Sequence, residues 1–170
     1  MMIHIRPATQ ADQKTIERII RDANINPMSL DWRRFVLAEE DGDPEPCPEQ
    51  SRRGSRRIIG VGQIKPHDDG SRELASIAVI PERQRQGIAS EIIRALLAKE
   101  QGDLYLICRD ELESLYARFG FYRIDSKEMT PYFRTIIRVI SIFARVAGRR
   151  GIVMKRDLLT EDRGRRTDDK

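Results

Sequence analysis

The sequence predicts an α+β (mixed α/β) fold in which helices cover both faces of one central sheet. Three features of the pattern lead to this prediction. Short apolar runs typical of strands recur along the chain, an amphipathic helix separates two of the most apolar runs, and a meander of strands precedes that helix. The 170 residues are enough for one domain with a hydrophobic core.

The chain begins with a strand and a helix. Residues 2–6 alternate apolar and polar side chains, which is typical of a strand, and the proline that follows ends it. Residues 11–22 place three isoleucines on one helical face, and Thr9 or Asp12 can cap this helix. A short further turn of helix is expected at 28–32.

A polar segment interrupts the strand meander that follows. Residues 41–57 hold three prolines, two glycines and many charges, so we expect a mobile loop that joins strands at 34–39 and 58–64. The second of these strands carries Gly60 and Gly62 on one face. This spacing favours the close approach of another element to the backbone.

The second half of the chain alternates strands and helices. An Asp-Gly turn at 67–71 predicts a hairpin, and a helical pattern at 111–119 ends at Gly120, which is typical of a C-cap. The remaining predicted elements are strands at 73–80, 104–108, 121–124 and 152–154 and a helix at 87–99.

An additional helix is predicted at 131–147, before the last strand. Apolar side chains cover most of its circumference, so we expect it to pack against the sheet, with a homodimer contact or a membrane surface as alternatives. We expect one domain over 1–159 and a disordered polar tail at 160–170.

The composition argues against several classes of protein. Charged residues make up 34% of the chain and no run of 18 apolar residues occurs, so no transmembrane segment is expected. The first residues lack the pattern of a secretory signal. Two cysteines, Cys47 and Cys108, make neither a disulfide framework nor a metal cluster. We therefore expect a cytoplasmic protein without a metal. The net charge of +4 permits an anionic ligand but does not by itself indicate one.

The stretch from Pro81 to Gly87 suggests a binding site. Gly87 directly precedes a predicted helix, where the first N–H groups lack partners and the helix dipole is positive. Such a helix start binds phosphate groups, and Arg83 and Arg85 add positive charge. Pro81 cannot donate a ladder hydrogen bond, so we expect strand pairing to lapse there and leave a slot for an extended ligand. A plain solvated turn is the alternative.

The same stretch resembles the coenzyme A signature of the GCN5-related N-acetyltransferase (GNAT) superfamily. That signature is Gln or Arg, two residues, Gly, one residue, then Gly or Ala, and Gln84, Gly87 and Ala89 match it. The LYARFGF segment at 115–121 is similar to a second family motif, and IRPAT is similar to the family's first strand and turn. The resemblance covers 2–124.

The resemblance implies the GNAT-like acyl-coenzyme A N-acyltransferase fold, with a mostly antiparallel mixed sheet, and acetyl-coenzyme A as the co-substrate. The helix at 131–147 is then an addition before the last strand. The residues that would bind the coenzyme are Ile77, Ala78 and Val79, by their backbone along the pantetheine arm, and Arg85, Gln86, Gly87, Ile88, Ala89 and Ser90, by their N–H groups at the pyrophosphate.

Two catalytic residues are also implied by the resemblance. Tyr116 would protonate the departing thiolate, for which a phenol is suited, and Glu73 would take a proton from the acceptor amine. Core packing is the alternative for Tyr116, and an edge salt bridge is the alternative for Glu73. Neither His4 nor His67 receives a role, and Cys108 is expected in the core.

The sequence thus predicts an N-acetyltransferase that moves an acetyl group from acetyl-coenzyme A directly to a primary amine of a protein or small molecule. One alternative is a catalytically silent acyl-coenzyme A-binding regulator. A less favoured alternative is a nucleic-acid or membrane-surface module built on the helix at 131–147, and no nucleic-acid partner is expected. Arg109 stands where the family often has Asn, which leaves one coenzyme or substrate contact open.

Overall fold

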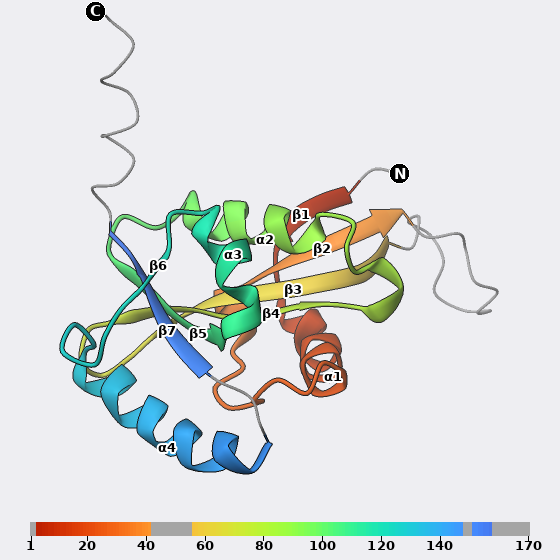
Figure 1. The fold of residues 1–170 in the computed structure, drawn as a ribbon. Helices are drawn as coiled ribbons and strands as arrows, with labels where there is room; N and C mark the ends of the chain where they lie inside the picture. The colour runs from red at the N-terminus through yellow and green to blue at the C-terminus, as the bar shows by residue number, and fades with distance from the viewer. Residues whose placement is uncertain (1–2, 42–55, 148–150, 158–170) are drawn as a thin grey trace, which may run out of the picture. The chain divides into compact units, whose positions relative to one another are not determined.

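The computed structural model describes residues 3–41, 56–147 and 151–157 (Figure 1). The strands are β1 (Ile3–Pro7), β2 (Phe35–Asp41), β3 (Arg56–Pro66), β4 (Arg72–Val79), β5 (Leu104–Arg109), β6 (Tyr122–Arg123) and β7 (Gly151–Arg156). The α-helices are α1 (Gln13–Asp22), α2 (Ile88–Leu97), α3 (Glu113–Ala117) and α4 (Pro131–Ala147). Short 3₁₀-helices are η1 (Gln10–Asp12), η2 (Trp32–Arg34), η3 (Pro81–Arg83) and η4 (Asp110–Leu112).

The strands are hydrogen-bonded in the order β1-β2-β3-β4-β5-β7-β6. Pairs β1–β2, β2–β3, β5–β7 and β6–β7 are antiparallel, and β4 pairs with β5 in parallel at Glu73 and Tyr105. The predicted α+β fold with a mixed, mostly antiparallel sheet is therefore confirmed. The chain forms two compact units, Met1–Ile64 with Ser76–Glu100 and Lys65–Ala75 with Gln101–Lys170. The single domain expected over 1–159 stays a prediction.

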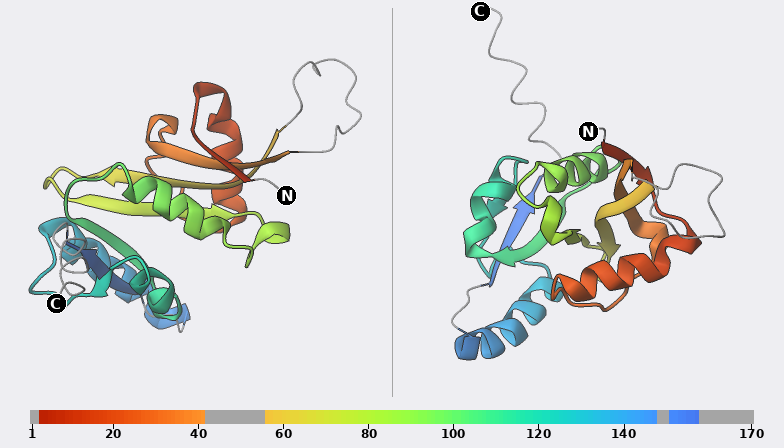
Figure 2. Two further views of the ribbon diagram at one scale, coloured as in Figure 1. Left: turned by 90° about the horizontal axis from the view of Figure 1, so that it is seen from above. Right: turned by 90° about the vertical axis from the view of Figure 1, so that its right-hand side faces the viewer.

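In the first unit, helices cover both faces of the strands. A Cβ built on Gly60 or Gly62 would lie within 3.0 Å of Ile92 of α2, so both glycines face that helix at very close range. Val61, between them, points to the opposite face and packs in a cluster with Ile16 of α1. Figures 1 and 2 show α1 and α2 on opposite faces of these strands. The close approach predicted from the two glycines is confirmed.

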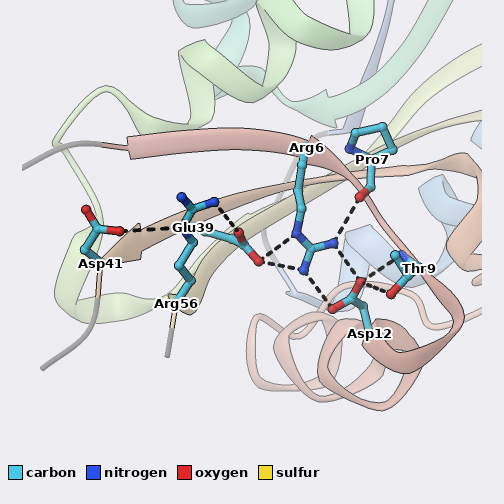
Figure 3. A network of polar contacts seen from close by, with 7 residues as sticks. All are labelled: Arg6, Pro7, Thr9, Asp12, Glu39, Asp41 and Arg56. Carbon is cyan, nitrogen blue, oxygen red and sulfur yellow. Dashed lines mark hydrogen bonds and ion pairs between the residues drawn. The ribbon is translucent and has the colours of Figure 1, made fainter. Parts of the chain in front are cut away.

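A charged network ties β1 to its neighbours in the first unit (Figure 3). Arg6 donates to Glu39 at 2.7 Å and to both carboxylate oxygens of Asp12 at 2.8 and 3.0 Å. Asp12 also accepts from the N–H and the hydroxyl of Thr9. Because Arg6 and Thr9 bind the carboxylate, the pKa of Asp12 is lowered to about 2. Arg6, Thr9 and Asp12, spaced three residues apart in the segment IRPATQAD, thus fix the turn between β1 and α1.

In the second unit, the start of α4 packs against β5 and β7. Phe133 is fully buried and stacks on Tyr105 with ring centroids 5.0 Å apart, and Val153 belongs to the same apolar cluster. The predicted helix at 131–147 and its packing on the sheet are confirmed for the side chains described, which run to Val139. The homodimer contact stays a prediction. Over the described ranges, no helix has the length and apolar character to cross a membrane.

Two local predictions are wrong. The turn of helix expected at 28–32 lies later, at Trp32–Arg34, because the Asp31 side chain accepts the N–H of Arg33 at 3.1 Å and so begins a 3₁₀ turn there.

The loop predicted at 41–57 is also too long at both ends, because β2 extends to Asp41 and β3 begins at Arg56. Asp41 belongs to β2, and Arg56 and Arg57 belong to β3, because opposite charges pair across these strands: Asp41 with Arg56, and Glu40 with Arg57. The rest of this loop, with Cys47, and the tail at 160–170 lie outside the described residues.

Candidate active site

The loop between β4 and α2 has two left-handed residues. Pro81 opens η3, Arg85 has φ +61°, and Gly87 has φ +83° and is the N-cap of α2. Left-handed backbone is easy for glycine and uncommon for arginine, so Arg85 is the unusual residue of this loop. The result is a tight turn that leads directly into the first helical turn.

Successive N–H groups of this turn remain available to a ligand. Outside regular helix and strand bonding, no hydrogen bond found in the described part of the chain uses an N–H between Arg85 and Ser90 as its donor. Gly87 has no side chain with which to cap the helix. A Cβ built there would meet no atom within 4 Å, so the space beside the turn is open. Free helix-start N–H groups beside an open space suit an anion such as a pyrophosphate.

Several polar side chains of the loop stabilise the loop itself. The amide of Gln84 donates to the carbonyl of Val79 at 3.1 Å, and that of Gln86 donates to Glu82 at 3.3 Å. Arg83 forms an ion pair at 2.8 Å with the buried carboxylate of Glu40. Arg83 therefore anchors the loop to β2, so its charge is paired with Glu40, whereas the sequence predicted that it would add positive charge for phosphates.

The β4 segment before the loop contains a backbone irregularity. Ser76 has φ +57°, and its hydroxyl accepts the amide of the fully buried Gln63 at 2.9 Å. This left-handed residue lies within β4 directly before 77–79, the segment expected to pair with the pantetheine arm. Ile80 still donates to Ile59 of β3, so pairing on that side runs up to Pro81.

Glu73, the candidate base, lies on β4 in the second unit and is buried. Its carboxylate is 2.9 Å from Nε2 of His67. Burial raises the pKa of Glu73, and His67 and Lys65 act against this rise. The alternative for Glu73, a salt bridge, is thus present as a carboxylate–imidazole contact with His67, although it is buried rather than at an edge, and the role of Glu73 as the base stays a prediction.

His67 is the main residue that sequence reasoning missed. Its ring is stacked on Tyr132 with centroids 3.5 Å apart and meets Phe133 edge to face at 5.7 Å. The hairpin at 67–71 was predicted, and a hairpin brings its two arms side by side. The sequence did contain one clue to this contact: His67 begins the predicted turn, and Glu73 lies two residues past the end of that turn, so the two side chains can meet across the hairpin.

Tyr116, the candidate general acid, lies on α3 in the second unit. Burial raises the pKa of Tyr116 to about 12, with the thiolate that Cys108 forms at high pH as a smaller cause, so the Tyr116 hydroxyl stays protonated near neutral pH and can donate. The ring meets Phe121 edge to face at 6.2 Å. Helix α3 ends at Ala117 with Arg118 as its C-cap, so Gly120, predicted as the C-cap, lies two residues further on, where it has φ +82° and donates its N–H to Ala117.

Cys108, Arg109 and His4 have contacts that suggest no catalytic role. Burial raises the pKa of the Cys108 thiol to about 11, and its sulfur lies 3.9 Å from that of Met154, as expected for a core residue. Arg109 pairs with Glu111 at the surface. His4 lies 4.0 Å from Asp41. Glu73 and Tyr116 thus belong to one unit, and the coenzyme-binding candidates at 77–79 and 85–90 belong to the other.

The fold is similar to that of several solved structures. N-acetylglutamate synthase from Neisseria gonorrhoeae, solved with coenzyme A and L-arginine, is 18% identical with a TM-score of 0.66 over 92% of this chain and 33% of that one. A Mycobacterium tuberculosis protein solved with coenzyme A is 17% identical with a TM-score of 0.63 over 92% of this chain and 99% of that one.

A third structure is that of the ribosomal-protein-S18-alanine N-acetyltransferase from Escherichia coli. It is 16% identical with a TM-score of 0.57 over 92% of this chain and 94% of that one. At these identities the likeness shows the fold. The chain spans about a third of the gonococcal enzyme's length.

Sequence comparison identifies the family. No curated protein is significantly similar to the chain in sequence. The family described as "Acetyltransferase (GNAT) domain" matches residues 31–123, which is more than half of the chain and includes both the loop before α2 and the helix that carries Tyr116. The chain therefore belongs to the GNAT acetyltransferase family.

Proposed function

We propose that this chain is an N-acetyltransferase that moves an acetyl group from acetyl-coenzyme A directly to a primary amine of a protein or a small molecule. The observation that carries the proposal is the turn before α2. There two left-handed residues, Arg85 and Gly87, lead into a helix start whose N–H groups are free and whose surroundings are open. Several solved structures of the same fold were obtained with coenzyme A, which supports the choice of ligand.

The proposed roles of the coenzyme-binding residues come from the family resemblance, and two features of the structure support them. The N–H groups at 85–90 would hold the pyrophosphate, and the backbone at 77–79 would lie along the pantetheine arm. The left-handed backbone of Ser76, directly before this segment, supports the second assignment, because such a residue is typical of an irregularity in a strand. When bound, acetyl-coenzyme A supplies an acetyl thioester.

Two residues of the second unit would act on protons. Glu73 would remove a proton from the acceptor ammonium group, since an amine must be neutral to act as a nucleophile. Tyr116 would donate its hydroxyl proton, or a hydrogen bond, to the departing thiolate. Its buried, protonated phenol supports this role. No covalent enzyme intermediate is required, and the protonated Cys108 thiol gives no reason to invoke one.

An acceptor screen tests this function directly. Purified protein is incubated with acetyl-coenzyme A and a panel of peptide N-termini, lysine peptides, polyamines and amino acids, and thiol release is followed. We expect turnover with at least one class of primary amine. Coenzyme A binding without turnover on any amine would instead favour a catalytically silent binder. Absence of coenzyme A binding would refute the proposal.

A further inference from the structure

Glu73 and His67 form a short contact that is buried, unlike an ordinary salt bridge at the protein surface. Glu73 is 9% exposed, and the only imidazole within hydrogen-bond distance of it among the described residues is that of His67, at 2.9 Å. Lys65 on β3 adds a positive charge that acts on the same carboxylate. A buried carboxylate is costly to ionise unless donors or positive charges face it.

The ring of His67 is fixed from several directions. Tyr132 stacks on one face with an interplanar angle of 18°, and the edge contact with Phe133 closes another side. The His67 backbone donates to Ser71 at 2.9 Å. Asp69, in the same turn, accepts the backbone N–H of Tyr132 at 2.9 Å and so ties the start of α4 to the hairpin.

This arrangement directs the ring nitrogen at the carboxylate. An ionised carboxylate can only accept hydrogen bonds, so Nε2 of His67 must carry the proton of the 2.9 Å contact when Glu73 is ionised. A ring held by stacking and by a hairpin keeps that donor in place without a flexible side chain having to be ordered at each turnover. The stacking of Tyr132 on the ring, and the hydrogen bond from the Tyr132 N–H to Asp69, therefore both help to hold the His67–Glu73 contact in place.

We propose that His67 is a positioning residue for the base: its Nε2–H holds the Glu73 carboxylate ionised and in one orientation, so that this carboxylate can accept a proton from the acceptor amine. The inference rests on the function proposed above. In the step itself, an N–H bond of the acceptor ammonium breaks, an O–H bond forms on Glu73, and the nitrogen keeps the electron pair with which it attacks the thioester carbonyl. The charge of His67 does not change in this step.

The kinetic test compares two replacements of His67 over a range of pH. His67→Leu removes the donor, so we expect kcat/KM to fall roughly 10- to 100-fold at pH 7 and the rising limb of its pH profile to move to higher pH. His67→Gln keeps an N–H donor and should recover most of the activity. The titratable groups that meet the ring are Glu73 and Tyr132; Lys65 acts on Glu73, and Asp69 binds the Tyr132 backbone. All four residues are kept in both variants. An equal loss at every pH, without recovery by glutamine, would show a merely structural role and overturn the proposal.

A second measurement needs neither coenzyme nor acceptor. The carboxyl ¹³C signal of Glu73, assigned by its absence in Glu73→Gln, is titrated in the wild type and in His67→Leu. We expect a higher midpoint in His67→Leu, because His67 opposes the effect of burial on the pKa of Glu73. His4→Leu, at the other of the two histidines, is the control and should leave this midpoint unchanged. An unchanged midpoint in His67→Leu overturns the inference. A shifted midpoint in a protein that acetylates no amine supports the pairing and removes only the proposed function.

Discussion

Gly87 offers a sharp test of the coenzyme-binding turn, because the chain holds a matched control. Gly87 has φ +83°, Gly70 in the hairpin has φ +81°, and a Cβ at either position would meet no atom within 4 Å. Alanine at either site should therefore cost about 1–2 kcal/mol through the left-handed backbone alone. For a chain of this size that corresponds to a fall in Tm of roughly 2–8 °C. Asparagine tolerates this conformation better, so Gly87→Asn should lose less stability than Gly87→Ala.

Coenzyme binding should separate the two sites. Side-chain atoms at Gly87 would occupy the open space beside the free N–H groups, and loss of one charge-assisted hydrogen bond there is worth about 1.5–3 kcal/mol. We expect Gly87→Ala and Gly87→Asn to bind coenzyme A roughly 10- to 100-fold more weakly by isothermal titration calorimetry. Gly70→Ala should bind like the wild type, and Gln86→Ala should change little. Wild-type affinity in Gly87→Asn, or an equal loss in Gly70→Ala, would refute the reasoning.

Three further predictions concern the acid, the charged network and the helix contact. Tyr116→Phe should lower kcat by roughly 100-fold while coenzyme A affinity stays within about twofold, and unchanged turnover would remove Tyr116 from the mechanism. Asp12→Asn should reduce the free energy of urea unfolding at pH 7. Because the pKa of Asp12 is lowered to about 2 by Arg6, the ionised form stabilises the fold above the unfolded pKa near 4. The difference between wild type and variant should therefore shrink as the pH falls from about 4 to 2, and a constant difference would contradict this account. Gly62→Ala should cost about 1–3 kcal/mol, because its Cβ would lie 2.6 Å from side chains that must move, whereas Gly102→Ala, with open space, should cost little.

Most of the fold could be predicted from periodicity and turn chemistry. The strand at 104–108 and the helix at 131–147 were placed within a residue or two, because long apolar patterns survive in any tertiary context. The ends of the 41–57 loop were misplaced for a different reason. Arg56 and Arg57 look like loop residues in isolation, and only cross-strand pairing with Asp41 and Glu40 makes them part of β3.

The candidate site was predictable only where residues close in sequence carry it. Gly87 and the turn before it were found because a polar stretch, a glycine and a helix follow one another along the chain. His67 was assigned no role although Glu73 is close in sequence, because the aromatic side chains that fix its ring, Tyr132 and Phe133, lie more than 60 residues away on α4. Likewise, nothing in the local sequence shows that Arg83 is committed to Glu40 rather than free for a phosphate.

By itself, the sequence determined the family, the order of strands and helices, and the helix start at Gly87, since each depends on neighbours along the chain or on backbone geometry that a single residue type permits. Tertiary structure decided which charges are paired. It placed Glu73, the base expected from the sequence, as a buried partner of His67, and it paired Arg83 and Arg6 with carboxylates on β2. The physical reason is that the ionisation and orientation of a side chain are set by burial and by partners within a few ångströms, and folding brings those partners from distant parts of the chain.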